Sequence, residues 1–256
     1  MSRRRNRFRE RLAQSEPMIG AYLSFPNPEL VEFLGHVGFD WVFFDGEHGG
    51  IGVETAYSLV RAADAAELPS MLRVPVNDPT QVLLYAETGV DAIMVPHVQD
   101  KSDAERFVQA LRYWPHGHRG AMASSRAANY GLTQTAAEYF GEPQSQPLAV
   151  ALLEDEVGCQ NASVVAGTPG IDIYFLGPGD LAMSVGLPAQ TDHPRVQELL
   201  WNACTELVDR GSTVGTLVGN AEAARKAFDA GMKMVVVSSG LLLSTQARSF
   251  LADARG

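Results

Sequence analysis

Eight short, almost continuously apolar stretches recur along the chain, with helical patterns between them. Continuous apolarity, rather than alternation of apolar and polar residues, is typical of parallel strands that are covered on both faces. Eight β/α alternations in 256 residues predict an α/β fold, a single (β/α)8 or TIM barrel. The predicted strands are Met18–Ser24, Trp41–Phe44, Ser70–Val74, Ala92–Val95, Leu148–Leu153, Ile173–Leu176, Val214–Val218 and Met234–Val237.

The predicted helices carry recognisable start signals. Asp78 and Pro79 have the N-cap and first-turn chemistry of a helix that follows the third strand. Ser102 and Glu105 have the spacing of a capping box, which predicts another helix start. A doubly wound open sheet is the alternative fold. No G-x-G-x-x-G motif follows the first strand, which disfavours the dinucleotide-binding form of that sheet.

Composition indicates a globular protein, because 46% of the residues are hydrophobic and 20% are charged. No apolar run approaches the ~18 residues of a membrane span, so we expect no membrane association and a cytoplasmic location. The net charge of −10 would repel phosphates, which argues against nucleic-acid binding. The arginine-rich start is therefore predicted to be a short helix, about residues 3–14, packed through Phe8 and Leu12 on one domain of residues 1–256.

Charged residues follow several predicted strands, at the end where the active sites of such barrels lie. Glu154 directly follows the fifth strand and Asp180 comes soon after the sixth. An unpaired carboxylate in apolar surroundings is costly, so this pair predicts a shared divalent cation. Asp45, Glu47 and His48 follow the second strand, and Arg73 lies at the end of the third. Each residue alone would suit a structural role, but their convergence predicts an enzyme.

The long segment 113–147 interrupts the regular alternation before the fifth strand. Loops of this length in a compact domain are usually functional or partly helical. We predict that it crosses the active-site rim. Within it, Ser124 either faces substrate or caps a helix, and Arg119 and Arg126 either hold an acidic substrate tail or are surface cations.

Six motifs occur in a fixed order: GFDWVFFDGEHGG (38–50), LRVPVNDP (72–79), AETG (86–89), RYWPHGHRG (112–120), LLE (152–154) and GPGDL (177–181). In this order they resemble the metal-dependent class II pyruvate aldolases, of the 4-hydroxy-2-oxoheptanedioate and 2-dehydro-3-deoxyglucarate aldolase type. The resemblance runs from about residue 6 to the C-terminus. It implies a single barrel of the phosphoenolpyruvate/pyruvate superfamily type.

The resemblance implies a metal site and a carboxylate site. Glu154 and Asp180 would ligate a divalent ion, and oxygen ligands suit Mg2+, Mn2+ and Co2+ alike. The ion would chelate the carboxylate and keto oxygens of a 2-oxo acid. Backbone N–H groups of Gly179 and Asp180 would bind that carboxylate, helped by the start of the following helix.

Further catalytic roles follow from the same resemblance. Arg73 would stabilise the enolate oxygen, and His48, in the segment that begins at Asp45, would be the general base with Glu87 as its supporting acid. Glu87 stands where the family has aspartate. Leu152 stands at a substrate-binding position where the family often has glutamine, which removes a hydrogen bond to the 2-oxo acid.

The implied reaction is the reversible retro-aldol cleavage of a 4-hydroxy-2-oxo acid to pyruvate, or hydroxypyruvate, and an aldehyde. The ligands would thus be small molecules, a 2-oxo acid and an aldehyde. The family also assembles as homohexamers, trimers of dimers in which the last helix packs on a neighbour. The segment Leu241–Ala254 is amphipathic enough for this, although it would also suit a helix that caps its own barrel.

Other activities remain open on the sequence alone. A Schiff-base aldolase needs a buried lysine, whereas Lys101 and Lys226 lie in polar helical segments and Lys233 precedes the last strand, at the wrong end. A CoA-ester lyase, a phosphonopyruvate-type enzyme and a non-catalytic acid-binding barrel are further alternatives. Cys159 and Cys204 lie on separate predicted helices without metal-ligand spacing, so no function is assigned to them.

Overall fold

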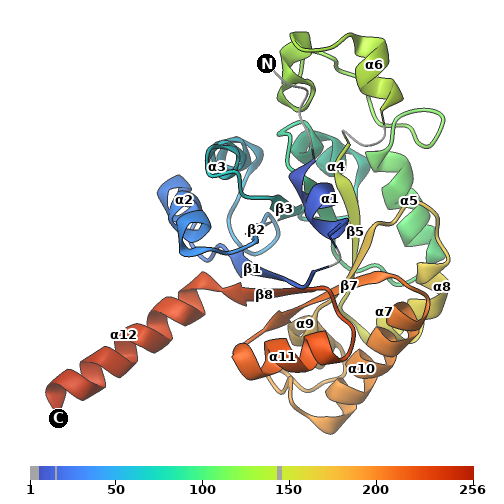
Figure 1. Cartoon of the computed structure of the whole chain (residues 1–256). Coiled ribbons are helices and arrows are strands. Elements are labelled where there is room, and N and C mark those ends of the chain that lie inside the picture. The colour runs from blue at the N-terminus through green and yellow to red at the C-terminus, as the bar shows by residue number, and fades with distance from the viewer. Residues whose placement is uncertain (1–5, 15, 143–145) are drawn as a thin grey trace.

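The computed structural model describes residues 6–14, 16–142 and 146–256, which form a closed barrel of eight parallel strands (Figure 1). Each strand pairs with the next one along the chain, and the last pairs with the first. The strands are β1 (Met18–Tyr22), β2 (Trp41–Asp45), β3 (Ser70–Arg73), β4 (Ala92–Val95), β5 (Leu148–Leu153), β6 (Ile173–Leu176), β7 (Thr213–Val218) and β8 (Met234–Ser238). The fold class and all eight predicted strands are confirmed.

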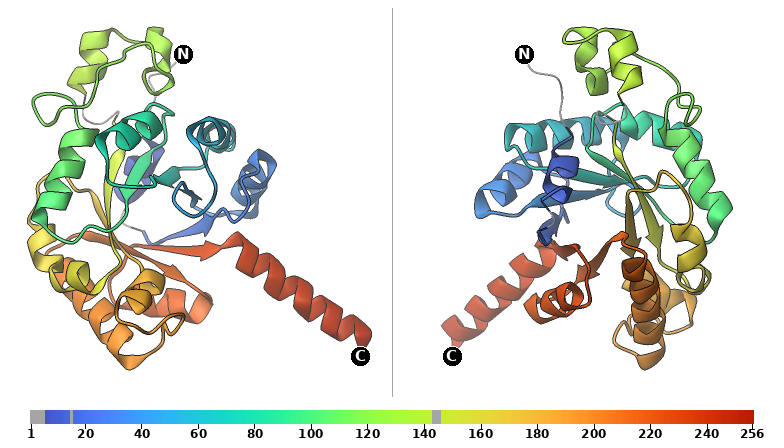
Figure 2. Two further views of the ribbon diagram at one scale, coloured as in Figure 1. Left: turned by 180° about the vertical axis from the view of Figure 1, so that it is seen from behind. Right: turned by 45° about the vertical axis from the view of Figure 1, so that its right-hand side comes forward.

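Helices cover the outside of the barrel (Figures 1 and 2). They are α1 (Arg7–Leu12), α2 (Pro28–Val37), α3 (Val53–Ala65), α4 (Pro79–Ala86), α5 (Lys101–Leu111), α6 (Ala136–Gly141), α7 (Glu156–Gln160), α8 (Ala162–Ala166), α9 (Pro178–Ser184), α10 (Pro194–Asp209), α11 (Ala221–Asp229), α12 (Ser239–Arg255) and the 3-10 helix η1 (Arg126–Gly131). The predicted start of α4 is confirmed, because the Asp78 carboxylate caps it and Pro79 opens it.

The start of α5 corrects a prediction. The helix begins at Lys101 and its N-cap is Asp100, so Ser102 and Glu105 do not form the predicted capping box. The Asp100 carboxylate accepts the backbone N–H of Asp103 at 2.9 Å. Because this carboxylate already satisfies an amide of the first turn, the N-cap lies two residues before the predicted cap, Ser102.

Helix α1 closes the N-terminal end of the barrel. Phe8 is fully buried, and its ring centroid lies 5.4 Å from that of Trp41 inside the barrel. Asn6 caps the helix and donates to the backbone oxygen of Asp91 at 2.7 Å. The predicted packing of this helix through Phe8 is therefore confirmed, and residues 3–5 of its predicted span lie outside the described residues.

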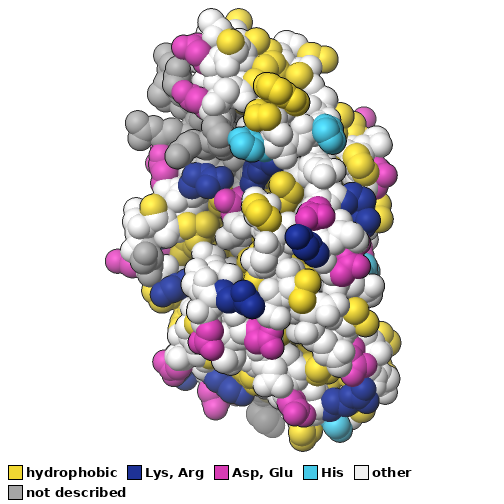
Figure 3. All heavy atoms as spheres, turned by 90° about the vertical axis from the view of Figure 1, so that its right-hand side faces the viewer, with side chains coloured by type: hydrophobic (Ala, Val, Ile, Leu, Met, Phe, Trp, Pro, Cys, Tyr) yellow, Lys and Arg dark blue, Asp and Glu magenta, His cyan; other side chains and the backbone are white. Residues whose placement is uncertain are grey.

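Residues 113–142 correct a second prediction. They follow α5 and lead to β5, so they leave and re-enter the barrel at its N-terminal end, where Arg126 donates to the backbone oxygen of Thr88. Active sites lie at the opposite end, so the segment does not cross the active-site rim of its own barrel. It projects from the body, and Figure 3 shows apolar side chains gathered on this projection, whereas charges of both signs are dispersed over the rest of that face.

Helix α12 leaves the barrel instead of packing on it, as all three ribbon views show (Figures 1 and 2). Every residue from Leu241 onwards is exposed. Across the described part of the chain, no helix is both long enough and apolar enough to cross a membrane.

Candidate active site

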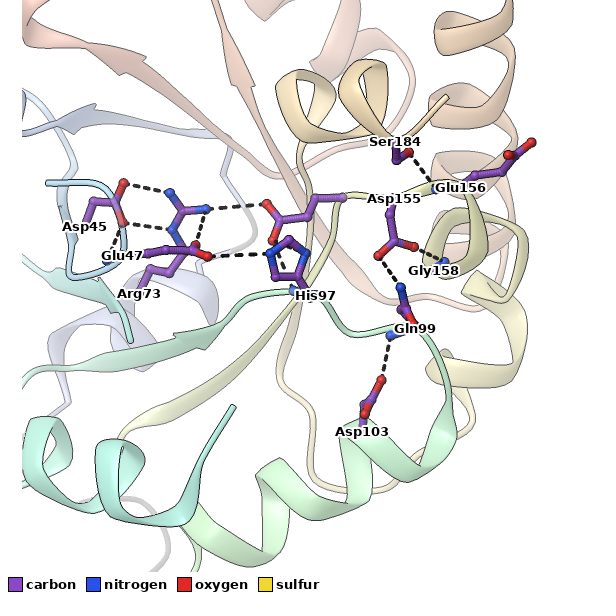
Figure 4. Close-up of polar contacts among 11 residues, drawn as sticks. Asp45, Glu47, Arg73, His97, Gln99, Asp103, Asp155, Glu156, Gly158 and Ser184 are labelled. Carbon is purple, nitrogen blue, oxygen red and sulfur yellow. Dashed lines mark hydrogen bonds and ion pairs between the residues drawn. The ribbon is translucent and has the colours of Figure 1, made fainter. Parts of the chain in front are cut away.

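Arg73 lies at the centre of a charged site at the C-terminal ends of the strands. Its Nε and Nη2 donate to the two carboxylate oxygens of Asp45, at 2.9 and 2.7 Å (Figure 4). The β2–β3 register puts the two residues directly opposite each other. Two parallel charge-assisted bonds fix the plane of the guanidinium. Its remaining nitrogen, Nη1, is thereby directed at the other carboxylates of the site.

The turn after β2 is organised by the same aspartate. Its Oδ1 accepts the backbone N–H groups of Glu47 and His48, at 3.0 and 3.3 Å. A Cβ at Gly49 would lie 2.4 Å from the Asp45 carbonyl oxygen, so this turn requires glycine there. Burial raises the pKa of Asp45, but the hydrogen bonds and charge of Arg73 outweigh burial and hold the pKa below its ordinary value.

Glu154 directly follows β5, and its side chain is only 1% exposed. Its Oε2 lies 3.4 Å from Arg73 Nη1, and its Oε1 accepts the backbone N–H of His97 at 3.0 Å. Burial raises the pKa of Glu154 to about 8, although Arg73 and the His97 amide lower it; the charges of Asp180 and Glu47 raise it further. The site therefore has too little positive charge to keep this carboxylate ionised.

Glu47, one of the predicted strand-end residues, joins the site together with His97, which was not predicted as a site residue. Glu47 Oε2 lies 3.0 Å from Arg73 Nη1, and Glu47 Oε1 lies 3.5 Å from His97 Nε2. His97 Nδ1 lies 3.4 Å from Glu154 Oε1 (Figure 4). The available signal was position, since both residues follow strands at the active-site end. The left-handed backbone of His97, with φ of 54°, brings its ring to these carboxylates and has no sequence signature.

Asp180 lies in the first turn of α9, directly after β6. The N-cap of this helix is Gly177, which has no side chain to cap the first-turn N–H groups, so these amides are suited to an anion. A Cβ at Gly177 would lie 2.7 Å from Glu154 Cβ, so glycine lets the two segments approach. A Cβ at Gly179 would meet no atom within 4 Å, which indicates free space beside the turn.

A cavity of about 270 Å³ lies at the C-terminal ends of the strands, and most of these groups line it, although Glu47 and His97 do not. Its lining contains seven of the predicted site residues: Asp45, His48, Arg73, Leu152, Glu154, Gly179 and Asp180. The fold thus brings together residues from the ends of β2, β3 and β5 and from the start of α9. The charged groups lie at one mouth of the barrel, as a strand-end site requires.

A larger groove of about 760 Å³ lies between α10 and α11 and shares Pro178 and Leu217 with the cavity. Its lining includes Lys226, whose Nζ lies 4.6 Å from the centroid of the Trp201 ring. Arg73 and the strand-end carboxylates do not line it. We therefore take the smaller cavity as the candidate active site.

Two predicted site residues lie elsewhere. The Glu87 carboxylate, at the C-cap of α4, bonds to Nη2 of buried Arg119 at 2.7 Å. Ser124 is exposed in the projecting segment. Neither residue lines the cavity of its own chain. Arg119 pairs with Glu87 and Arg126 with Asp64, and both arginine side chains are largely buried, so the surface-cation interpretation is wrong. Neither arginine lines the cavity, so the structure gives the substrate-tail interpretation no support.

The lysines stay away from the cavity, as the sequence predicted. Lys101 pairs with Glu105 on the exposed face of α5, and Lys233 precedes β8 at the N-terminal end of the barrel. No lysine lines the cavity. A Schiff-base nucleophile is therefore missing from the site that the described residues form.

The fold and the strand-end site define an enzyme of the (β/α)8 barrel class. Residues 18–244 match the family model described as HpcH/HpaI aldolase/citrate lyase. The chain belongs to this family, and with it to the aldolases, which are carbon–carbon lyases.

Named relatives agree with this membership. The chain is 32% identical over 248 residues to a 5-keto-4-deoxy-D-glucarate aldolase of Shigella boydii, a match that covers 97% of this chain and 95% of the relative. A solved HpcH/HpaI aldolase/citrate lyase family protein of Burkholderia cenocepacia superposes with a TM-score of 0.91 at 31% identity, covering 98% of this chain and 100% of the other. The citrate synthase SbnG superposes with a TM-score of 0.83 at 25% identity, over 96% of each chain.

Proposed function

We propose that the chain, as one barrel domain, catalyses reversible retro-aldol cleavage of a 4-hydroxy-2-oxo acid. The products are pyruvate, or hydroxypyruvate, and an aldehyde. One observation carries the proposal. Arg73, held by Asp45, faces buried Glu154 at the mouth of a cavity that Asp180 and His48 also line. The relative in Shigella boydii, named 5-keto-4-deoxy-D-glucarate aldolase, supports this reaction class.

The donor set fits a divalent cation. Arg73 is the only cation paired with Asp45, Glu47 and Glu154 in the described part of the site, so negative charge is in excess. Burial raises the pKa of Glu154, and a bound cation would favour its ionised form. The described residues contain no cluster of three or more His, Cys, Asp or Glu side chains that could hold a metal. The protein ligands would thus be the pair Glu154 and Asp180, as suits a cation that keeps several waters.

A bound Mg2+, Mn2+ or Co2+ would supply Lewis acidity to the keto oxygen of the substrate. Arg73 Nη1 supports the negative charge that develops on that oxygen during cleavage. His48 lines the cavity and accepts the proton of the C4 hydroxyl through its imidazole, as a general base does. The first-turn N–H groups of Gly179 and Asp180 bind the substrate carboxylate. The predicted support of His48 by Glu87, and a substrate role for Ser124, stay predictions.

We propose in addition that the chain assembles with copies of itself through α12. This helix has 17 residues and exposes Leu243 (63%) and Phe250 (68%). Most of the stability of a helix in a protein comes from the packing of its apolar face, and α12 has no such packing on its own barrel. The outer face of β1 exposes Ile19 at 42%, and neighbouring α2 exposes Phe33 at 62%, at the position where an eighth barrel helix would pack. A second copy's α12 suits this open position, in keeping with the implied hexamer, a trimer of dimers.

The test of the activity is aldol addition with pyruvate and a panel of aldehydes, with and without EDTA. We expect product with Mg2+, Mn2+ or Co2+ and none with EDTA. Borohydride should trap no adduct on the protein, because the cavity contains no lysine. Turnover that survives EDTA and is stopped by borohydride would contradict the proposal.

A further inference from the structure

We propose that the cavity selects a 2-oxo acid donor whose C3 carries only hydrogen or a methyl group, and that Leu152 sets this selectivity. The inference rests on the proposed aldolase function and names the donor class of the same site. Pyruvate and 2-oxobutanoate are donors of this kind. Hydroxypyruvate, which carries a hydroxyl on C3, is not.

The floor of the cavity is apolar. Side chains two positions apart on a strand point to the same side, so Phe43 lies one step deeper than Asp45, and Leu152 one step deeper than Glu154. Both Phe43 and Leu152 line the cavity and belong to the buried interior of the barrel. Phe175 of β6 extends the same apolar surface. Tyr22 also lines the cavity, and its hydroxyl donates to Asp45 Oδ2 at 3.4 Å. Apart from this hydroxyl, which is directed at the charged end, the floor is built from hydrocarbon.

The charged groups occupy only the mouth. The three oxygens of a 2-oxo acid accept hydrogen bonds or bind a cation. Arg73, the N–H groups in the first turn of α9, and the cation that Glu154 and Asp180 would hold supply that chemistry. Once these groups engage the oxygens, the C3 substituent is left facing the apolar part of the lining. A hydroxyl there would lose its water without gaining a hydrogen bond. A methyl group would gain contacts instead.

Leu152 is a floor residue that lies beside the segments that would hold the donor. It lies two residues before Glu154 on β5. A Cβ at Gly177, in the turn before Asp180, would lie 3.4 Å from Leu152 Cδ1. Leu152 therefore packs between both acidic segments, with its side chain 3% exposed. A polar side chain at this one position would place a hydrogen-bonding group beside C3.

The chemical step is the same for each donor. A base removes one proton from C3, C3 forms a bond to the aldehyde carbon, and the aldehyde oxygen receives a proton. With 2-oxobutanoate the product carries one additional methyl group on C3. No oxidant or reductant takes part. The donors therefore differ only in the C3 substituent that contacts the floor of the cavity.

The test compares two donors, 2-oxobutanoate and hydroxypyruvate, by their kcat/KM values with one aldehyde and Mn2+. Methyl and hydroxyl are similar in size, so the ratio reports polarity. We expect the wild type to favour 2-oxobutanoate by about tenfold or more, the order by which apolar pockets discriminate. Leu152→Asn should lower this ratio by about tenfold, whereas Leu152→Met, the apolar control, should leave it within about threefold. A ratio measured on one enzyme does not depend on its active fraction.

Three outcomes would overturn the inference. Equal or better use of hydroxypyruvate by the wild type would contradict the donor class. A ratio unchanged in Leu152→Asn, or in Leu152→Gln should the first variant not fold, would remove Leu152 as its cause. If no donor reacts in the wild type, the aldolase function itself fails and the inference falls with it, so the two failures are distinguishable.

Discussion

Asp45 and Arg73 stand directly opposite each other at the ends of β2 and β3 and are joined by two hydrogen bonds, at 2.9 and 2.7 Å. Because the strand register fixes both Cα positions and the two bonds fix the guanidinium plane, the direction of Nη1 is determined by the barrel itself. Nη1 meets Glu47 at 3.0 Å and Glu154 at 3.4 Å. The guanidinium of Arg73 is therefore preorganised before any substrate binds.

Replacing this arginine by lysine tests the preorganisation. Arg73→Lys keeps the charge but loses the fork that binds Asp45, so we expect kcat for pyruvate release to fall by about 10²–10³, as for loss of an oxyanion donor. The matched control is Arg126→Lys, which alters the Asp64 pair outside the cavity. Its kcat should stay within about twofold. Near-normal turnover by Arg73→Lys would remove the arginine from the reaction.

The raised pKa of Glu154 predicts how stability depends on pH in the metal-free protein. Burial lifts this pKa from 4.5 to about 8, so the folded state retains a proton that the unfolded state releases. Stability should therefore decrease as pH rises between those values, by up to about 1.4 kcal/mol per pH unit. Urea unfolding in EDTA at several pH values measures this slope. Glu154→Gln should flatten it, and an equal slope in the variant would refute the assignment.

The exposed apolar side chains of α12 predict the assembly surface. Leu243→Ser combined with Phe250→Ser should lower the mass measured by light scattering, because these side chains would lose their burial in a neighbouring copy. Gln246→Ser is the polar control on the same helix and should leave the mass unchanged. A wild-type chain that is already monomeric at micromolar concentration would rule out this assembly.

Both cysteines should be inert in the folded protein. Burial raises the pKa of Cys159 to about 12 and that of Cys204 to about 11, and the thiolate is the reactive form. At pH 8 we expect a thiol reagent to label neither residue in buffer and both in urea. Rapid labelling of the native protein would show that the helices α7 and α10 open.

The sequence predicted the barrel well because its strands are buried on both faces, which leaves a continuous apolar signature at runs such as Leu148–Leu153. Asp45, Arg73 and Glu154 were predictable for the same reason, since a charge at the end of such a run stands out. His97 was not, because its contacts depend on a left-handed backbone. Ser124 was assigned to the rim because length alone does not tell which end of a barrel a loop occupies.

The central claim is that Glu154 and Asp180 bind the divalent cation on which catalysis depends. Manganese titration combined with a turnover assay tests it most directly. We expect the wild type to bind one Mn2+ and to release pyruvate from a 4-hydroxy-2-oxo acid. Glu154→Ala and Asp180→Ala should each lose both properties while they keep the far-ultraviolet circular dichroism of the barrel. Wild-type turnover by either variant, or full activity of the wild type in EDTA, would contradict the account.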